Sequence, residues 1–218
     1  MSKRGLKKRL ETERLMGVDA LLRSPGPEAE LRAIEQQVMA CTLCPLHRER
    51  TQGVFARGSA RADLMFVGEA PGAEEDRQGV PFVGPAGKLL DKMILAMGLK
   101  RDEVYISNIL KSRPPGNRDP RPDEVEACFP YLRRQIELVQ PKVICTLGRP
   151  AACALLNTNS SMGSLRGRWH FYEGIALLPT YHPAYLLRSP GQKRLAWEDL
   201  KMVMVALVEG PPKPNTLF

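Results

Sequence analysis

Several features are scarce in this chain of 218 residues, and each scarcity argues against a class of protein. No apolar run approaches the roughly 20 residues needed to span a bilayer, so we expect no transmembrane segment. The basic N-terminus lacks the apolar stretch of a secretory signal peptide, so we expect a cytoplasmic protein. Five cysteines are present, and an odd number without a signal peptide argues against a disulfide framework.

Acidic side chains are also in the minority, because 32 Lys and Arg oppose 24 Asp and Glu and leave a net charge of +8. Such a balance favours a polyanionic partner, usually nucleic acid. Residues 1–25 contribute seven basic and three acidic side chains, half of the net charge. This basic arm is either a solvated, frayed terminus or a non-specific DNA tether. We divide the chain into the arm at 1–27, one domain at 28–209 and a Pro-rich tail at 210–218.

Four short, mostly apolar segments predict strands at residues 62–67, 104–109, 142–147 and 175–178. Helical patterns precede, separate and follow them, at residues 27–40, 86–97, 122–139, 150–156 and about 192–208. The alternation predicts an α/β fold, a three-layer α/β/α sandwich with a central four-stranded parallel sheet. Right-handed crossovers then bring the carboxyl ends of all four strands to one edge, where ligands bind in such folds.

Polar, turn-rich segments follow three of the predicted strands and therefore meet at that edge. They begin at Gly68, Asn108 and Thr180. A loop rich in Gly and Pro is usually only a loop, and a single His is more often structural. Their shared location nevertheless favours a binding site.

Cys41 and Cys44 form a CxxC unit. The unit follows a predicted helix, whereas a thioredoxin-type redox pair would follow a strand. This position favours metal or cluster ligation over redox chemistry. Two thiolates do not complete a metal site, so further ligands must come from elsewhere in the chain.

Three longer segments resemble motifs of the family-four uracil-DNA glycosylases. GEAPG at 68–72 with GVPFVGPAG at 79–87 resembles the first motif, KSRPPGNR at 111–118 the middle loop, and HPAYLLR at 182–188 the second motif. The resemblance extends from about residue 28 to 209, in the family's order. It implies an α/β/α sandwich that removes uracil from DNA, leaves an abasic site, and carries a [4Fe–4S] cluster.

The resemblance also implies four cluster ligands, and this chain departs from the pattern at one of them. Cys41, Cys44 and Cys128 match three ligand positions, whereas Ser112 stands where the third cysteine is expected. Cys145 falls inside a predicted strand and is not expected to replace it. Three outcomes stay open: a complete cluster with Ser112 as a ligand, a labile or three-iron cluster, or no cluster.

The resemblance and side-chain chemistry together predict a pocket for a flipped uracil. Phe82 is expected to stack on the base, and Asn108 to read its edge through an amide that both donates and accepts. Core packing for Phe82 and a strand-end cap for Asn108 are the alternatives. Glu75 is expected to exclude the methyl group of thymine. The other expected pocket residues are Gly68 and Ala70.

Three further side chains are candidates for the catalytic step. His182 is expected to donate a hydrogen bond to uracil O2 as the leaving group gains negative charge. Glu69 is expected to position the attacking water, with Asp76 as the second choice. A loop-bracing role is the alternative for Glu69.

Basic and apolar side chains of the same loops are expected to contact DNA. The expected backbone contacts are Lys111, Arg113, Arg118, Arg121 and Arg188. The residues expected to fill the gap left by the flipped nucleotide, or else to form a helix packing face, are Tyr185, Leu186 and Leu187. We expect a monomer that acts on uracil-containing DNA and contacts no membrane. A catalytically silent iron–sulfur DNA-binding module is the main alternative, and a CxxC redox protein is a third.

Overall fold

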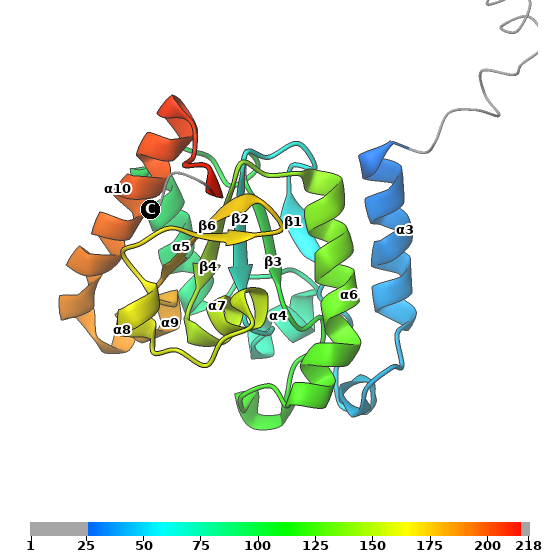
Figure 1. Cartoon of the computed structure of the whole chain (residues 1–218). Coiled ribbons are helices and arrows are strands. Elements are labelled where there is room, and N and C mark those ends of the chain that lie inside the picture. Colours follow the sequence, from blue (N-terminus) through cyan, green and yellow to red (C-terminus); the bar gives the residue numbers. More distant parts are fainter. Residues whose placement is uncertain (1–25, 215–218) are drawn as a thin grey trace, which may run out of the picture.

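The computed structural model describes residues 26–214 and shows helices on both faces of a central sheet (Figure 1). This arrangement confirms the predicted α/β/α class. The predicted basic arm lies almost entirely outside the described residues, as does the end of the Pro-rich tail. Among residues 26–214, no helix is both long and apolar enough to cross a bilayer.

The sheet has six strands in the order β1-β3-β2-β4-β6-β5. Its four central strands run parallel and correspond to the four predicted ones: β2 (Leu64–Gly68), β3 (Tyr105–Asn108), β4 (Val143–Leu147) and β6 (Ile175–Thr180). The structure has two strands that were not predicted, the antiparallel edge strands β1 (Ala56–Gly58) and β5 (His170–Tyr172). Each edge strand has three residues, too few for an alternating pattern to show in the sequence.

The five predicted helices are present, with ends within about one residue of the predicted ones: α3 (Pro27–Ala40), α5 (Pro85–Ala96), α6 (Pro122–Val139), α7 (Arg149–Leu156) and α10 (Lys193–Glu209). Shorter helical segments lie in the loops: α4 (Ala73–Gln78), α8 (Met162–Leu165), α9 (Pro183–Arg188), and the 3-10 turns η1 (Pro45–Arg48), η2 (Pro115–Asn117) and η3 (Pro190–Gln192). Proline stands in the first turn of η1, α5, α6, α7 and α9. The first backbone N–H groups of a helix have no partner within it, so the missing N–H of proline costs nothing there.

Strand β2 shows how the two hydrophobic cores form. Met65 and Val67 pack with α3, α6 and α7 on one face of the sheet. Leu64 and Phe66 pack with α5 and α10 on the other. Because both faces are covered, the strand is apolar throughout, as expected of a buried parallel strand.

The carboxyl ends of β2 and β3 lie side by side, because Gly68 and Asn108 are paired in the sheet register. Thr180 ends β6 and pairs with Leu147 at the end of β4. The loops that leave these strands therefore start from one edge. This edge carries the candidate site.

Candidate active site

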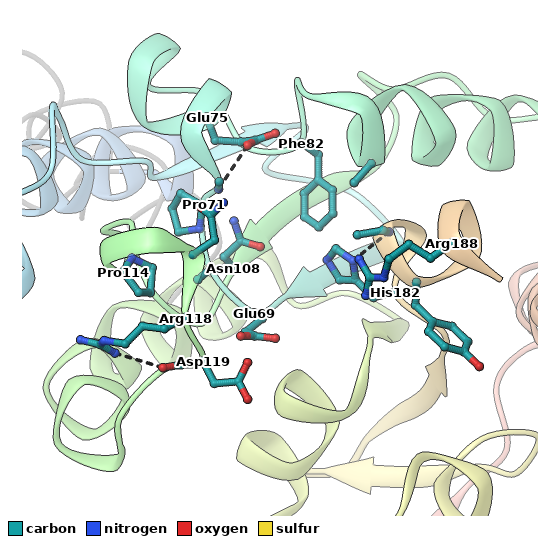
Figure 2. Close-up of a pocket in the computed structure, with 16 residues that line it drawn as sticks. Glu69, Pro71, Glu75, Phe82, Asn108, Pro114, Arg118, Asp119, His182 and Arg188 are labelled. Carbon is teal, nitrogen blue, oxygen red and sulfur yellow. Dashed lines mark hydrogen bonds between the residues drawn. The ribbon is translucent and has the colours of Figure 1, made fainter.

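A pocket of about 400 Å³ opens at the carboxyl edge of the sheet (Figure 2). Its walls come from the loops after β2, β3 and β6, the three segments that the sequence singled out. The pocket brings together six residues predicted for base binding, catalysis or DNA contact: Glu69, Ala70, Phe82, Asn108, His182 and Tyr185. Three more of the predicted residues border it, which makes nine: Glu75, Arg118 and Arg188.

Gly68 allows Phe82 and Asn108 to approach each other. A Cβ atom on Gly68 would lie 2.3 Å from Asn108 Oδ1 and 2.6 Å from Phe82 Cζ, so any side chain there would displace both groups. Asn108 is 2% exposed, and its Oδ1 is buried without a hydrogen-bond partner within residues 26–214. A buried polar atom left unpaired is costly. The Asn108 amide is therefore open to a ligand that supplies the missing partner.

The loop that carries Phe82 is held in an unusual backbone conformation. Phe82 has φ of 55°, which costs a non-glycine residue about 1–3 kcal/mol. Arg101 Nη2 donates to the carbonyls of residues 81 and 82 at 2.7 and 2.8 Å. Glu75 Oε1 accepts from the backbone N–H groups of residues 83 and 84, both at 2.8 Å. These contacts hold the ring at the pocket, 5.7 Å from the His182 ring centroid.

Glu75 borders the pocket and also binds the backbone of two neighbouring segments. Its second oxygen, Oε2, accepts from the backbone N–H of Gly72 at 3.1 Å, so both carboxylate oxygens bind main-chain amides. The contacts therefore show that Glu75 holds the Phe82 loop, and because Glu75 also borders the pocket, its exclusion of the thymine methyl group stays a prediction.

His182 caps the N-terminus of α9, and this contact determines its tautomer. The backbone N–H of Ala184 donates to His182 Nδ1 at 3.1 Å, so the ring proton lies on Nε2. Burial, with a smaller effect of Arg188, lowers the pKa of His182 to about 4. The imidazole is therefore neutral near pH 7 and has one N–H to donate. Figure 2 shows the ring facing Phe82, Asn108 and Glu69.

Glu69 is a carboxylate of the pocket with a raised pKa. Burial, with a smaller effect of Asp119, raises the pKa of Glu69 to about 7. Figure 2 shows the two carboxylates of Glu69 and Asp119 near each other on the side of the pocket opposite Phe82. Such a pKa suits a group that binds and orients a water and accepts its proton near neutral pH.

Asp76 does not belong to the pocket. It is 4% exposed, and its carboxylate accepts from the Thr51 backbone N–H at 2.9 Å and from the Thr51 hydroxyl at 2.7 Å. Asp76 thus anchors the segment after the CxxC unit to α4. Its role as second choice for the catalytic carboxylate is corrected, because these contacts place it away from the reacting groups.

Lys111 is a second correction. The prediction placed it in an exposed loop, but it is 1% exposed. Its Nζ donates to Ser107 Oγ at 2.7 Å, to Asn108 O at 2.6 Å and to Gln135 Oε1 at 2.6 Å. Burial lowers its pKa to about 7. Lys111 therefore holds the backbone carbonyl of Asn108, and its burial leaves no access to a DNA phosphate.

The other predicted DNA contacts divide by exposure. Leu186 is 1% exposed and lies on the buried face of α9, which corrects its assignment as a wedge and fits the alternative of a helix packing face, whereas Leu187 is 44% exposed. Arg121 and Arg188 are exposed. Arg113 and Arg118 are half-buried: Arg113 Nε donates to Asn117 Oδ1 at 2.8 Å, and both Arg118 Nη atoms donate to Glu124.

The cysteine segment lies where the end of α3 approaches α6. Cys41 ends α3, Cys44 precedes η1, and Cys128 on α6 is 7% exposed. Burial raises the pKa of the Cys128 thiol to about 11, and nearby Cys44 and Cys41 contribute in the same direction. In the part of the chain that the structure describes, no three His, Cys, Asp or Glu side chains meet closely enough to hold a single metal ion.

Ser112 lies beside this segment and already has a partner. It is 5% exposed, and its Oγ accepts from Arg50 Nη1 at 2.9 Å. Arg50 Nη2 also donates to the carbonyls of Met39 at 2.7 Å and Cys41 at 3.2 Å. Cys41, Cys44 and Cys128 are thus neighbours, and Ser112, at the position expected for the third cysteine, carries a hydroxyl that is paired with a guanidinium.

Two residues that shape the site were missed from the sequence. Asp119 borders the pocket and raises the pKa of Glu69, and Arg101 holds the Phe82 loop. Asp119 lies in the middle loop directly after the KSRPPGNR motif, so its position was available as a signal. Arg101 lies 19 residues after Phe82 and carries no local signal.

Together the fold and the pocket define a class: an α/β/α sandwich whose carboxyl edge brings an aromatic ring, a buried amide, an imidazole and a carboxylate to one pocket. Residues 55–201 match the uracil DNA glycosylase superfamily. A type-4 uracil-DNA glycosylase of Sulfurisphaera tokodaii is 46% identical over 79% of this chain and 83% of the relative. Those of Saccharolobus solfataricus and Archaeoglobus fulgidus are 44% and 42% identical, over 83% and 78% of this chain and 88% and 89% of the relatives. The chain belongs to this type-4 family, which confirms the resemblance of its motifs.

Proposed function

We propose that this chain hydrolyses the N-glycosidic bond between uracil and deoxyribose in DNA and leaves an abasic site. Its membership of the type-4 family supports this activity. The observation that carries it is the buried, unpartnered Oδ1 of Asn108 beside the Phe82 ring. This pair offers a stacking face and a polar edge to one flat base.

Base recognition follows from the chemistry of the amide. Uracil must leave the duplex stack to reach the pocket. Asn108 accepts from uracil N3–H and donates to O4. Cytosine presents an acceptor at N3 and a donor at N4. This pattern is the reverse of that of uracil, so cytosine does not match the Asn108 amide in this orientation.

Bond cleavage uses His182 and Glu69. As the glycosidic bond breaks, its electron pair leaves with uracil N1, and negative charge spreads to O2. His182 Nε2–H donates to that oxygen. Glu69 orients a water whose oxygen bonds to the anomeric carbon, and the carboxylate accepts the proton that the water loses.

Cys41, Cys44 and Cys128 are the thiolates that we propose as ligands of an iron–sulfur cluster. When bound, such a cluster would cross-link the CxxC segment to α6 and supply no group to the base. Ser112 lacks a thiolate, and its hydroxyl binds Arg50. Oxygen is a weaker ligand than thiolate for iron in such clusters, so we propose that the cluster is held less firmly than by four cysteines.

The proposed activity is tested by single-turnover excision from a labelled oligonucleotide with one uracil, beside a thymine control. His182→Ala should lower the rate at least about a hundredfold, because one preorganised donor to a developing oxyanion is worth about 2.7–4 kcal/mol. DNA affinity should change little, since phosphate contacts dominate it.

His170→Ala is the matched control. His170 Nε2 bonds to the carbonyl of Leu165 at 2.9 Å, outside the pocket, and the variant should excise uracil at the rate of the unaltered protein. If the unaltered protein binds DNA but excises no uracil, the proposal is wrong and the silent DNA-binding module is favoured. A His182→Ala variant with an unchanged rate would remove His182 from the mechanism.

A further inference from the structure

A second pocket of about 340 Å³ adjoins the first. The two pockets share Glu69, His182 and Tyr185. These shared residues include the two that act on the glycosidic bond. The second pocket therefore begins where the bond is cut and extends away from the uracil site.

The size of this space exceeds what the reaction needs. A water molecule occupies about 30 Å³ of liquid, roughly a tenth of the pocket. The volume is instead close to the 400 Å³ of the pocket assigned to uracil. The second space is therefore of a size to receive another planar ring.

Two tyrosine rings line this pocket, and the ring of Tyr181 contacts a fixed arginine. The rings of Tyr181 and Tyr185 lie 5.1 Å apart between centroids, tilted by 36°. The Arg166 guanidinium lies 5.5 Å from the centroid of the Tyr181 ring. Arg166 is fixed in turn by Asp199, fully buried, with contacts of 2.7 Å to Oδ1 and 3.1 Å to Oδ2. A stacking surface ordered in advance loses little entropy when a base binds.

The pocket is also lined by an apolar side chain and a positive charge. Met162, the first residue of α8, faces the pocket, and Arg149 lies at the start of α7. Arg149 Nε and Nη2 donate to the carbonyls of Ser160 at 3.0 Å and Asn159 at 2.9 Å, which holds the segment leading to Met162. Arg149 is exposed and brings a positive charge suited to a phosphate.

We infer that this second pocket, lined by Arg149, Met162, Tyr181 and Tyr185, binds the base of a nucleotide next to the uracil in the same strand. We name it the flanking-base pocket. Its three residues in common with the uracil site favour a group covalently joined to the uracil nucleotide over one from the opposite strand. Base stacking on tyrosine accepts any base, so the pocket would add affinity without reading sequence. The inference rests on the proposed function.

The first test uses single-stranded oligonucleotides with one uracil and a stable abasic analogue on its 5′ or its 3′ side. These substrates keep the phosphates and remove one neighbouring base. The unaltered protein should lose about tenfold in kcat/KM with one of the two, as expected for one stacked base. Equal kcat/KM for all three substrates would overturn the inference.

Variants then locate the effect. Met162→Trp should fill the flanking-base pocket and abolish the dependence on the neighbouring base. Met93→Trp, the same change in an apolar groove lined by α5, α9 and α10, should retain it. Tyr181→Leu removes the ring and should also lower the dependence, which keeps the inference testable if Met162→Trp does not fold.

The outcomes separate the two proposals. Failure of the unaltered protein to excise uracil from any substrate would overturn the proposed function. Normal excision with a tenfold dependence that persists in folded Met162→Trp and Tyr181→Leu would overturn only the flanking-base pocket.

Discussion

At the scale of single residues, the proposed recognition of the base depends on the two polar atoms of one amide. Asn108 is buried at the end of β3, and Gly68 leaves room for it beside Phe82. Lys111 holds its backbone carbonyl at 2.6 Å. The amide is thus positioned before any base arrives, which is the condition for strong discrimination by a polar group.

Asn108→Asp should lose uracil excision at least about tenfold and gain weak excision of cytosine. An ionised carboxylate accepts hydrogen bonds but donates none, and cytosine N4–H₂ is a donor. Single-turnover assays on uracil, cytosine and thymine oligonucleotides measure this. Asn117→Asp is the control, since Asn117 borders the pocket on an exposed loop and bonds to Arg113. Unchanged uracil excision by Asn108→Asp would place Asn108 outside base recognition.

The pKa of Glu69 predicts how the rate of excision falls on the acid side of its pH profile, the acid limb. In the proposed mechanism the ionised carboxylate is the active form, and the pKa of Glu69 is raised to about 7. Excision, measured as kcat/KM, should therefore fall about tenfold per pH unit as the pH drops below 7. His182 does not cause this limb, because its pKa is lowered to about 4.

Two variants check that assignment. Glu69→Gln should be slow at every pH, with no limb near pH 7. Asp119→Asn removes a neighbouring negative charge that raises the pKa of Glu69, so its limb should move to lower pH. A limb that stays at pH 7 in Glu69→Gln would assign it to another group.

At the scale of elements, residues 108–112 join the uracil pocket to the cysteine segment. Asn108 lines the pocket, and the backbone N–H of Lys111 donates to Cys128 Sγ at 3.1 Å. Ser112 then binds Arg50, which also holds the carbonyl of Cys41. Any group held by the cysteines would therefore stabilise the segment that positions Asn108.

Ser112→Cys should carry more iron per chain and lose it more slowly in air. A ligand bound only by the folded state stabilises that state, so the melting temperature should rise, by about 2–4 °C for each 1 kcal/mol gained. Excision should change little, since the cluster touches no base. Iron analysis, absorbance in air and thermal unfolding measure these effects.

Cys153→Ser is the control for that experiment, because Cys153 lies on α7 and its iron content should match that of the unaltered protein. Both Ser112→Cys and the unaltered protein are purified without oxygen. Absence of iron from both would show that the cluster proposal is wrong.

At the scale of the whole molecule, net charge should govern association with DNA. Residues 1–25 contribute seven basic and three acidic side chains, +4 of the total +8. Each phosphate contact adds about 0.9 to the slope of log affinity against log salt for duplex DNA.

Replacing the seven Lys and Arg of residues 1–25 by Gln should weaken DNA binding at low salt and reduce this slope. Affinity measured over a salt series tests the prediction, with excision of uracil from saturating substrate as the control that the site is intact. A slope equal to that of the unaltered protein would show that the arm makes no phosphate contact, which is the solvated-terminus interpretation.

The sequence alone determined the layers, the four parallel strands and the edge that carries the site, because burial on both faces leaves apolar runs and turn residues mark their ends. Phe82, Asn108, Glu69 and His182 were predicted from their places at or after strand ends together with the family motifs, and all four line one pocket.

Only the tertiary structure decided which neighbour each polar group meets. Lys111 was expected to contact the DNA backbone, yet it is buried against Gln135. The bonds of Glu75 to the backbone at residues 83 and 84 had no signal in the sequence. Leu186 turned inward because α9 packs on α5. The flanking-base pocket arises from α7, α8 and the start of α9, segments that no local pattern connects. Hydrophobic periodicity records which side of an element is buried, but the partners of a buried polar atom come from distant segments.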